Sequence, residues 1–442
     1  MVLSTETRIQ KLSALRVPEE DQFVQKLHYR GETKPHKVSR IDLDYLIYNR
    51  HNGRLEAEML TWEQENAASP EDYDDDLHQV IDELLWKSSI QKNKQTLSDL
   101  DDKGQQRPGI VSLDGVIIDG NRRAMLLRRL EKQTGKKQYL DAIILPDSYA
   151  DNQTEIVRLE TQYQLGEDAK VEYGPLQKYL HVRRLVDLGI PVDQVDKLMS
   201  ERPGNARRLL DIMALMDEYL EHIRCPRLYT MLKDSDGTKE GMFVDLHNDL
   251  NRINGGKHKI PWAFDAELDP LQLRLIQFDY IRLGDFADAK KVYREISHQG
   301  NGKNFFATKE IWEQFRDSHQ MTVDPVTAEM GSLQDFIHDN PDQFENKADA
   351  ARARDLKWSE RVRDQMKRNF GQSSYKLNLA TEVLKPGEYL KRAKDYLDKI
   401  DLDSAALLSA TENLALATEI NRLTFAIKKK FEEQARAEAR VG

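Results

Sequence analysis

The chain has 442 residues, which is too long for one hydrophobic core and predicts about three domains. Its 66 basic and 76 acidic residues give a net charge of −10, which argues against a nonspecific nucleic-acid coat, although one face can still be basic. A single cysteine, Cys225, excludes an internal disulfide and a cysteine-based zinc site. Residues 1–10 show no secretory signal, and no stretch is long and apolar enough to cross a membrane. We therefore expect a cytoplasmic protein with no membrane partner.

Residues 1–37 are mixed and polar, and we interpret them as an N-terminal extension. An extended segment around 37–41 opens the first domain, expected over 38–150. A strand or short helix over 42–48 leads into Tyr48-Asn49-Arg50, and a helix is expected at about 77–92.

The most informative stretch lies between residues 104 and 146. A turn over 104–108 leads into an apolar strand over 109–113, and Asp114-Gly115 predicts a two-residue hairpin to the return strand 116–118. This strand runs directly into Asp119-Gly120-Asn121-Arg122-Arg123, where a helix begins. A further strand is expected over 140–146.

An apolar strand that ends in Asp-Gly-Asn-Arg-Arg and enters a helix is suited to phosphate binding. Gly120 allows a tight turn and a close approach of the backbone to a ligand. The amides of the first helical turn favour phosphate, and Arg122 and Arg123 add charge and bidentate donors. The alternative is that Asp119 caps the helix while both arginines are solvated.

This order of elements resembles the ParB N-terminal (ParB/sulfiredoxin-like) family over residues 38–220. Members have a Gly-X-X-X-Pro turn, a strand hairpin and a Gly-Glu-Arg-Arg helix start, which correspond here to 104–108, 110–118 and 120–123. The segment Asn49-Arg50, with Arg54 after it, is similar to the family's Asn-Pro-Arg segment without its proline.

The resemblance implies a nucleotide-binding domain that takes a nucleoside triphosphate, CTP or ATP, with Mg²⁺. The nucleotide-binding residues that it implies are Asn49, Arg50, Gly104, Arg107, Pro108, Asp119, Gly120, Asn121, Arg122 and Arg123. Glu160 is the nearest counterpart of the family's magnesium-binding glutamate, although its segment lacks the neighbouring asparagine and arginine. Asn121 replaces the glutamate of the phosphate turn. Because sulfiredoxin chemistry needs a cysteine at that place, this activity is excluded.

After residue 150 the pattern predicts helices at 152–165, 174–188, 192–200 and 205–222, and we expect a domain over 151–224. Its last three helices resemble the ParB helix-turn-helix. If this segment reads duplex DNA, Asn205, Arg207 and Arg208 would face bases or phosphates. Residues 173–224 carry eight basic and eight acidic side chains, which fits a plain helical packing module as well.

We expect a helical middle domain over 225–341 and a helical tail over 342–442, with Pro386-Gly387 as its clearest break. Near its end the tail carries an apolar stripe at 4-3-4-4 spacing, formed by Leu416, Ile420, Leu423, Ile427 and Phe431. Such a stripe is typical of a core or a dimer seam. We favour a homodimer through these helices, with a partner protein as the alternative.

Together these patterns predict an α+β fold: a small mixed-sheet domain, then mostly helical domains that include a helix-turn-helix. The expected function is that of a nucleotide-binding, DNA-associated ParB-like factor of bacterial partition, regulation or phage defence. Two alternatives stay open. One is a nucleotide-dependent enzyme of the same fold, a triphosphatase or phosphotransferase. The other is a helical scaffold whose ParB-like domain is vestigial.

Overall fold

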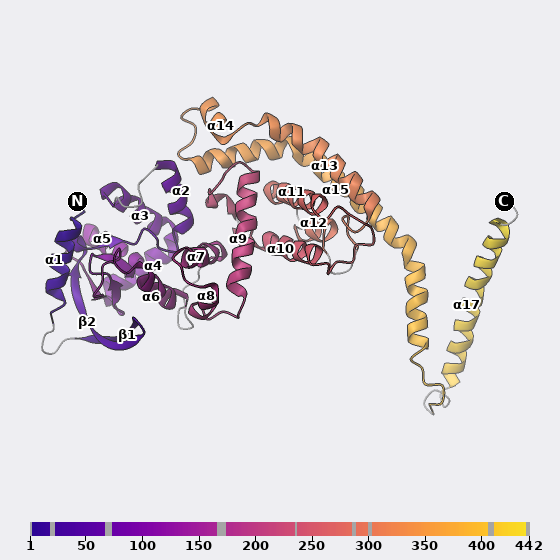
Figure 1. Cartoon of the computed structure of the whole chain (residues 1–442), viewed down its shortest axis with the longest axis horizontal. Helices are drawn as coiled ribbons and strands as arrows, with labels where there is room; N and C mark the ends of the chain where they lie inside the picture. The colour runs from indigo at the N-terminus through magenta and orange to yellow at the C-terminus, as the bar shows by residue number, and fades with distance from the viewer. Residues whose placement is uncertain are drawn as a thin grey trace. The chain divides into compact units, whose positions relative to one another are not determined.

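The computed structural model describes residues 2–17, 23–66, 73–165, 174–234, 237–284, 289–298, 303–404 and 411–438. The chain divides into two compact units, Met1–Ser374 and Tyr375–Gly442. The predicted α+β fold is confirmed, because a small mixed sheet near the N-terminus is followed by many helices (Figure 1). In the described ranges, no helix combines the length and apolar character that a membrane crossing requires.

Within these residues the main sheet has six strands in the order β1-β2-β6-β4-β5-β3. Their bounds are β1 Val24–Tyr29, β2 Glu32–Asp42, β3 Ile47–Tyr48, β4 Gly109–Val111, β5 Val116–Asp119 and β6 Tyr139–Ile144. β3 pairs with β5 and β4 with β6 in parallel, whereas β1–β2, β2–β6 and β4–β5 are antiparallel. The predicted hairpin between β4 and β5 forms, but its loop is longer than two residues. The Ser112 N–H donates to the Val116 carbonyl at 2.9 Å around Leu113-Asp114-Gly115, where Gly115 has a φ of +84°.

The sheet starts earlier in the chain than the sequence indicates. Residues 1–37, the predicted N-terminal extension, contain helix α1 (Thr5–Leu15), strand β1 and the first half of β2. β1 and β2 are joined by Arg30-Gly31, with φ of +55° and +74°. Arginine is not a residue that favours this conformation, so the turn carries no Asn-Gly or Asp-Gly signal.

Both faces of the sheet are covered. On one face, Ile117 of β5 packs in a cluster with Leu126 of α5, and on the other, Ile118 packs with Ile156 of α6. The helices of this region are α2 Glu56–Asn66, α3 Asp75–Lys87, α4 Ile90–Lys103, α5 Asn121–Thr134 and α6 Gln153–Leu165, and Leu43–Tyr45 forms the short helix η1. Helices α3, α4 and α5 pack against one another. The start of α5 therefore lies between the end of β5 and helix α4.

The predicted helix-turn-helix segment forms three helices, α7 Pro175–Asp187, α8 Val192–Leu198 and α9 Asn205–His222. These bounds and those of α6 agree with the sequence prediction to within two residues at each end. The three helices pack on one another around Leu185, Val195 and Leu209. Helix α6 packs against α7 and α8 on one side and against β1 and β5 of the sheet on the other.

The rest of the first unit is helical apart from a two-stranded ribbon. Its elements are η2 Tyr229–Leu232, β7 Lys233–Asp234, β8 Gly237–Thr238, α10 Glu240–Asn254, α11 Leu268–Leu283, α12 Ala289–Ile296, α13 Lys309–Glu329 and α14 Leu333–Asp339. Helix α15 (Lys347–Leu397) runs from the first unit into the second, which also contains α17 (Thr411–Glu438). The predicted break at Pro386-Gly387 is wrong, because α15 continues through Pro386 to Leu397. Both residues are exposed there, and the helix tolerates the missing backbone donor of Pro386, the crowding of the carbonyl four residues earlier and the glycine that follows.

Candidate functional site

A cavity of about 280 Å³ lies at the N-terminus of α5, close to the lower end of the roughly 300–1,000 Å³ of small-molecule sites. It is lined by Asn52, Arg54, Leu85, Thr96, Leu100, Asp119, Gly120, Asn121, Arg122 and Arg123. The structure therefore brings the predicted strand–turn–helix residues 119–123 together around one space. The loop after β3 and the helices α3 and α4 supply its other walls.

Gly120 gives the backbone its direction at this cavity. Its φ of +107° lies in the left-handed region, which residues with a Cβ rarely adopt. Its carbonyl accepts the first helical hydrogen bond, from the Ala124 N–H at 2.8 Å, and no side chain caps the helix. Because the first N–H groups of a helix lack intrahelical acceptors, the start of α5 presents partial positive charge to the cavity.

Three arginines line the cavity, and two of them repel each other. Arg122 Nε donates to Asn93 Oδ1 at 2.5 Å, whereas its Nη2 is buried without a hydrogen-bond partner among the described residues. Burial and the nearby Arg54 guanidinium lower the pKa of Arg122. Burial also lowers the pKa of Arg123, against the attraction of Asp119. An anion between these guanidinium groups would relieve the repulsion and replace the lost solvation.

Residue Asn52 sets the position of Arg54. The Asn52 side chain is buried, and its Oδ1 accepts a hydrogen bond from the Arg54 N–H at 3.0 Å. This local turn follows β3 directly, so the loop brings Arg54 to the start of α5. The sequence signal for it is the pair of arginines four residues apart, Arg50 and Arg54.

The predicted turn over 104–108 supports the cavity from outside. The Arg107 carbonyl accepts a hydrogen bond from Arg123 Nη1 at 2.6 Å. Gly104 ends α4 with a φ of +64°, and Pro108 directly precedes β4. Gly104, Arg107 and Pro108 are not among the described residues that line the cavity. The turn therefore orients Arg123 rather than forming a wall.

Asn121 is buried, and both polar atoms of its side chain are hydrogen-bonded. Its Oδ1 accepts from the Asn49 N–H at 2.9 Å, and its Nδ2 donates to the Ile117 carbonyl at 2.8 Å. The side chain thus joins the start of α5 to the segment after β3. Asn49 itself is buried beneath the turn. Arg50 does not line the cavity and forms an ion pair with Glu63 of α2 at 2.7 Å.

Glu160 of α6 lies on the other side of Asn49. Its carboxylate oxygens are 3.3 and 3.4 Å from Asn49 Nδ2 and 3.9 Å from Arg184 Nη1 of α7. Arg184 also donates to the His51 carbonyl at 2.7 Å and to the Tyr149 hydroxyl. Glu160 does not line the cavity, and the described residues contain no group of three or more His, Cys, Asp or Glu placed to hold a metal. Glu160 of α6 is thus held by the loop after β3 and by α7. This arrangement does not fit a magnesium ligand.

A second cavity, of about 560 Å³, lies beyond Arg184, where α2, α7 and α9 meet. Glu56 of α2 lines it, and its Oε2 is buried without a hydrogen-bond partner among the described residues. Burial raises the pKa of Glu56 to about 7, although Arg184 opposes the shift. Residues of both charges line this space, so its lining favours no single class of ligand.

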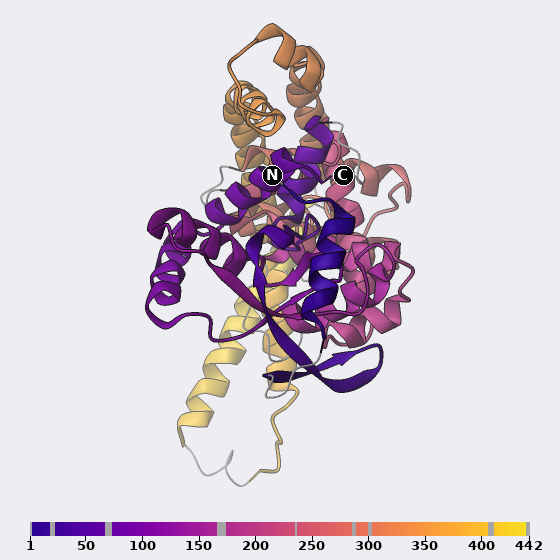
Figure 2. The same ribbon diagram turned by 90° about the vertical axis from the view of Figure 1, so that its left-hand side faces the viewer.

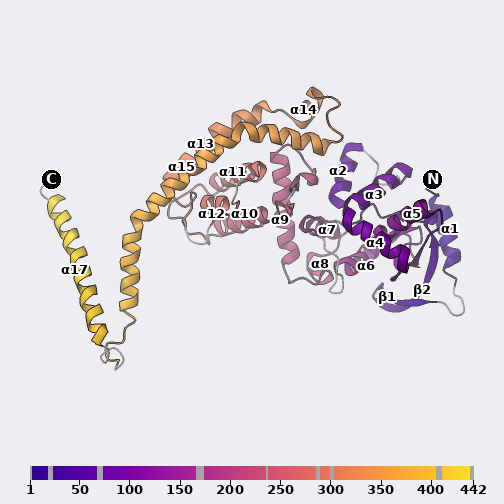
Figure 3. The same ribbon diagram turned by 180° about the vertical axis from the view of Figure 1, so that it is seen from behind.

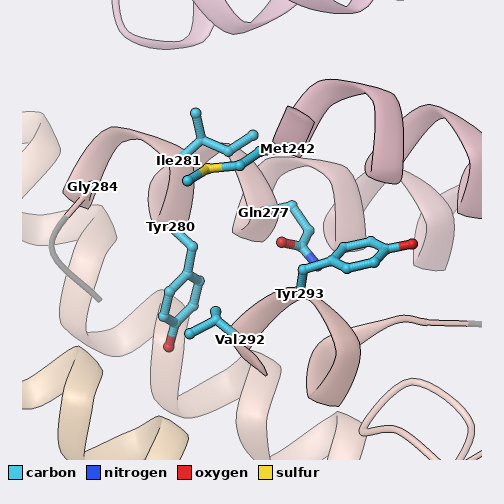
Figure 4. Close-up of a pocket in the computed structure, with 7 residues that line it drawn as sticks. All are labelled: Met242, Gln277, Tyr280, Ile281, Gly284, Val292 and Tyr293. Atoms are coloured by element: carbon cyan, nitrogen blue, oxygen red, sulfur yellow. The ribbon is translucent and has the colours of Figure 1, made fainter. Parts of the chain in front are cut away.

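The cavity in Figure 4 is much smaller, with a volume of about 20 Å³. Gln277 and Tyr293 lie side by side at one end of it, and Met242 and Ile281 lie together at the other. Gln277 Nε2 donates to Ser297 Oγ at 3.1 Å, so its polar end is already bonded. This volume holds about one water molecule, and we interpret the space as a packing void between α10, α11 and α12.

In the helix-turn-helix segment, the three predicted DNA-contact residues have different surroundings. Asn205 donates to Glu201 Oε2 at 3.1 Å, and Arg207 is exposed. Arg208 is half-buried near His247 of α10, whose pKa is lowered by burial and by this arginine. Asp196 of α8, which the sequence analysis missed, accepts from the N–H groups of Gly204 and Ala206, both at 2.7 Å. It fixes where α9 begins.

No family model matches the chain, and no curated protein matches it either.

Proposed function

We propose that the cavity at the start of α5 binds the phosphates of a nucleoside triphosphate, CTP or ATP, and that the protein is a nucleotide-binding, DNA-associated factor of the ParB type. The observation that carries the proposal is the charge of the cavity lining. Three arginines, Arg54, Arg122 and Arg123, face one carboxylate, Asp119, beside an uncapped helix N-terminus. Such a site favours a multiply charged anion.

The cavity lining also contains what a nucleoside needs. Leu85 and Leu100 provide an apolar wall, and Thr96 and Asn52 provide polar groups beside it. Magnesium would enter this site bound to the phosphate oxygens. Asp119 supplies the carboxylate of the cavity lining. Because Asn121 is neutral and both polar atoms of its side chain are hydrogen-bonded, we propose that the site binds the nucleotide. Hydrolysis by a triphosphatase or transfer by a phosphotransferase is the alternative.

A chain of polar contacts supports a response of the helix-turn-helix to the nucleotide. Asn121 at the cavity contacts Asn49, Asn49 contacts Glu160, and Glu160 lies 3.9 Å from Arg184 of α7. α7 is the first helix of the helix-turn-helix and packs against α9. A ligand that moves the start of α5 would therefore act on α7 through buried groups joined by hydrogen bonds and, at Arg184, by an ion pair.

The nucleotide proposal is tested by thermal shift with each of the four ribonucleoside triphosphates, with and without magnesium. At about one hundred times the Kd, binding adds about 2.7 kcal/mol. A unit of 374 residues unfolds with an entropy of about 0.8 kcal/mol/K, so Tm should rise by about 3 °C. Arg54→Ala/Arg122→Ala should reduce the rise below about 1 °C, because two charge-assisted contacts are lost.

Lys132→Ala is the matched control, since Lys132 is exposed in the last turn of the same helix. It should keep the full shift. The proposal fails if no nucleotide shifts the wild type at millimolar concentration, or if the double arginine variant and the control shift equally.

The DNA part of the proposal is tested with labelled duplex, with and without nucleotide, at low and moderate salt. We expect Arg207→Ala/Arg208→Ala to weaken binding, by about 1–3 kcal/mol for an arginine that reads a base. Equal binding by variant and wild type would show that α8 and α9 are an internal packing unit, as the helical-scaffold alternative requires. The setting we propose is the bacterial cytoplasm, which suits a lone buried cysteine whose pKa burial raises to about 11.

We further propose that α17 pairs with its copy in a homodimer. Its predicted stripe is exposed, from 38% at Ile420 to 65% at Phe431, so the described residues of this chain do not cover it. Light scattering should give twice the chain mass of 51.3 kDa, and deletion of 404–442 should give the monomer. A monomer before and after the deletion would leave a partner protein as the occupant.

A further inference from the structure

A two-stranded ribbon extends from the edge of the main sheet. β2 pairs with β1 through residues 32–37 and with β6 through residues 38–42. Residues 24–37 therefore continue past the sheet as β1 and the first half of β2, and Figure 2 shows this ribbon projecting from the domain. The fold, the cavity and the helix-turn-helix leave this projection without a role.

The ribbon has an excess of basic residues, although the protein as a whole is acidic. The ribbon, residues 24–37, contains four basic residues, Lys26, Arg30, Lys34 and Lys37, and one acidic residue, Glu32, and Arg40 follows on β2. Lys26 and Arg40 are exposed, and the Lys34 and Arg30 side chains are 66% and 54% exposed. His28 and His36 lie among them.

The ribbon is also held firmly in place. Leu27 and Tyr29 are buried in the cluster that contains Ile156 of α6. The Tyr29 hydroxyl donates to Asp147 Oδ2 at 2.7 Å, and Arg30 forms an ion pair with the same carboxylate at 2.5 Å. One side of the ribbon is thus anchored. Lys34, which is opposite Leu27 in the register, lies on this side and forms an ion pair with Glu32, whereas Lys26 lies on the other side; both are exposed. Lys37 is half-buried and donates to the Val17 carbonyl at 2.9 Å.

Helix α6 places the ribbon beside the helix-turn-helix. α6 packs against β1 and also against α8. In Figures 1 and 3 the ribbon, α6, α8 and the start of α9 follow one another along the same edge of the unit. A duplex that lies across the start of α9 would therefore extend toward the ribbon.

We infer that the β1–β2 ribbon is a second contact to duplex DNA, in which Lys26 and Lys34 bind phosphates beside the segment that α9 contacts. The inference rests on the proposed DNA association and supplies what that proposal lacks. Residues 173–224 have eight basic and eight acidic side chains, so the helix-turn-helix alone offers little phosphate affinity. A ribbon with four basic residues and one acidic residue adds to it, and two-stranded ribbons fit DNA grooves.

The test is the binding of a labelled duplex of mixed sequence to the full chain, over a range of salt. Lys26→Glu/Lys34→Glu removes two phosphate contacts, each worth about 8-fold at roughly 0.1 M salt, so affinity should fall about 60-fold or more. The slope of log K against log salt should become shallower by about 1.8. The matched control is Lys309→Glu/Lys367→Glu, two exposed lysines of α13 and α15 with the same charge change. It should bind as the wild type does.

Each outcome decides between the ribbon and the helix-turn-helix. Equal affinity of the ribbon variant and the control overturns the inference, even where Arg207→Ala/Arg208→Ala weakens binding. A loss with the ribbon variant alone supports it and removes the α9 contact. No duplex binding by the wild type, with or without nucleotide, overturns both proposals.

Folding of the ribbon variant is checked by circular dichroism and by an unchanged nucleotide-induced shift. If the charge reversal fails to fold, Lys26→Gln/Lys34→Gln takes its place, with the same loss of two contacts expected. Vesicles that contain phosphatidylserine are the last arm. A ribbon variant that loses vesicle binding and keeps duplex binding would show a lipid surface and overturn the inference.

Discussion

Asn121→Ala removes the side chain that ties the start of α5 to the segment after β3. Its Oδ1 accepts from the Asn49 N–H and its Nδ2 donates to the Ile117 carbonyl. The exposed fractions of Asn121, Asn49 and Ile117 are 3%, 1% and 0%, so the two backbone groups that Asn121 pairs lie in the protein interior. The substitution therefore leaves one buried donor and one buried acceptor without partners. Each costs about 1–3 kcal/mol, and we expect a loss of about 2–6 kcal/mol in the free energy of unfolding.

The assay is urea denaturation of the full chain, followed by tryptophan fluorescence. Trp62 and Trp86 lie in α2 and α3 and pack against the cluster that contains Ile117, so they report on this region. Hydrogen exchange of the α5 amides locates the effect in the structure.

Asn66→Ala is the control, because the exposed Asn66 also makes one side-chain hydrogen bond, to the Trp62 carbonyl at 2.8 Å. It should change stability by less than about 0.5 kcal/mol. If Asn121→Ala is as mild as this control, the reasoning is refuted. The Asn121 side chain would then be available to a ligand and would not serve as a structural link.

Two further predictions concern pH. Burial raises the pKa of Asp279, but hydrogen bonds with His222 and His319 outweigh burial and lower it from 3.8 to about 2. The stability that this carboxylate contributes is therefore present above about pH 4 and lost as the pH falls toward 2, so Tm should fall less steeply in that range for Asp279→Asn than for the wild type. For Glu56, burial raises the pKa from 4.5 to about 7, so the folded protein loses stability as the pH rises through that interval. Glu56→Gln should stabilise the protein at pH 8 by up to about 3 kcal/mol and have little effect at pH 4; urea denaturation that shows the same difference at both values would contradict this.

The parts of the structure that the sequence predicts are those with local signals. The Asp114-Gly115 hairpin, the glycine at Gly120 and the helical periodicity of 174–222 each depend on residues close together in the chain, and each gives the expected element. The β1–β2 ribbon has no such signal. Its turn uses Arg30 at a positive φ, and Asp147, more than a hundred residues later, contacts that arginine.

The candidate site also has one part that local sequence signals predict and another part that they do not. Residues 119–123 are predicted because the strand, the turn and the helix follow directly in the chain. Arg54, Asn93 and Arg184 come from three other segments. Only the folded structure shows that the first two lie beside Arg122 and that Arg184 lies beside Glu160. The break predicted at Pro386-Gly387 is a local signal that failed, because α15 continues through both residues despite the roughly 3 kcal/mol that a proline costs inside a helix.

Asn121 and Glu160 both form buried links between segments of the structure. At position 121 the side chain must both accept from an N–H and donate to a carbonyl, which an amide can do and a glutamate carboxylate cannot. Glu160 has its carboxylate between Asn49 and Arg184, so its charge is balanced inside the protein and not at the cavity. The cavity is left with Arg54, Arg122 and Arg123 against Asp119. If it holds a triphosphate, as we propose, these arginines and the amides at the start of α5 must balance most of the phosphate charge.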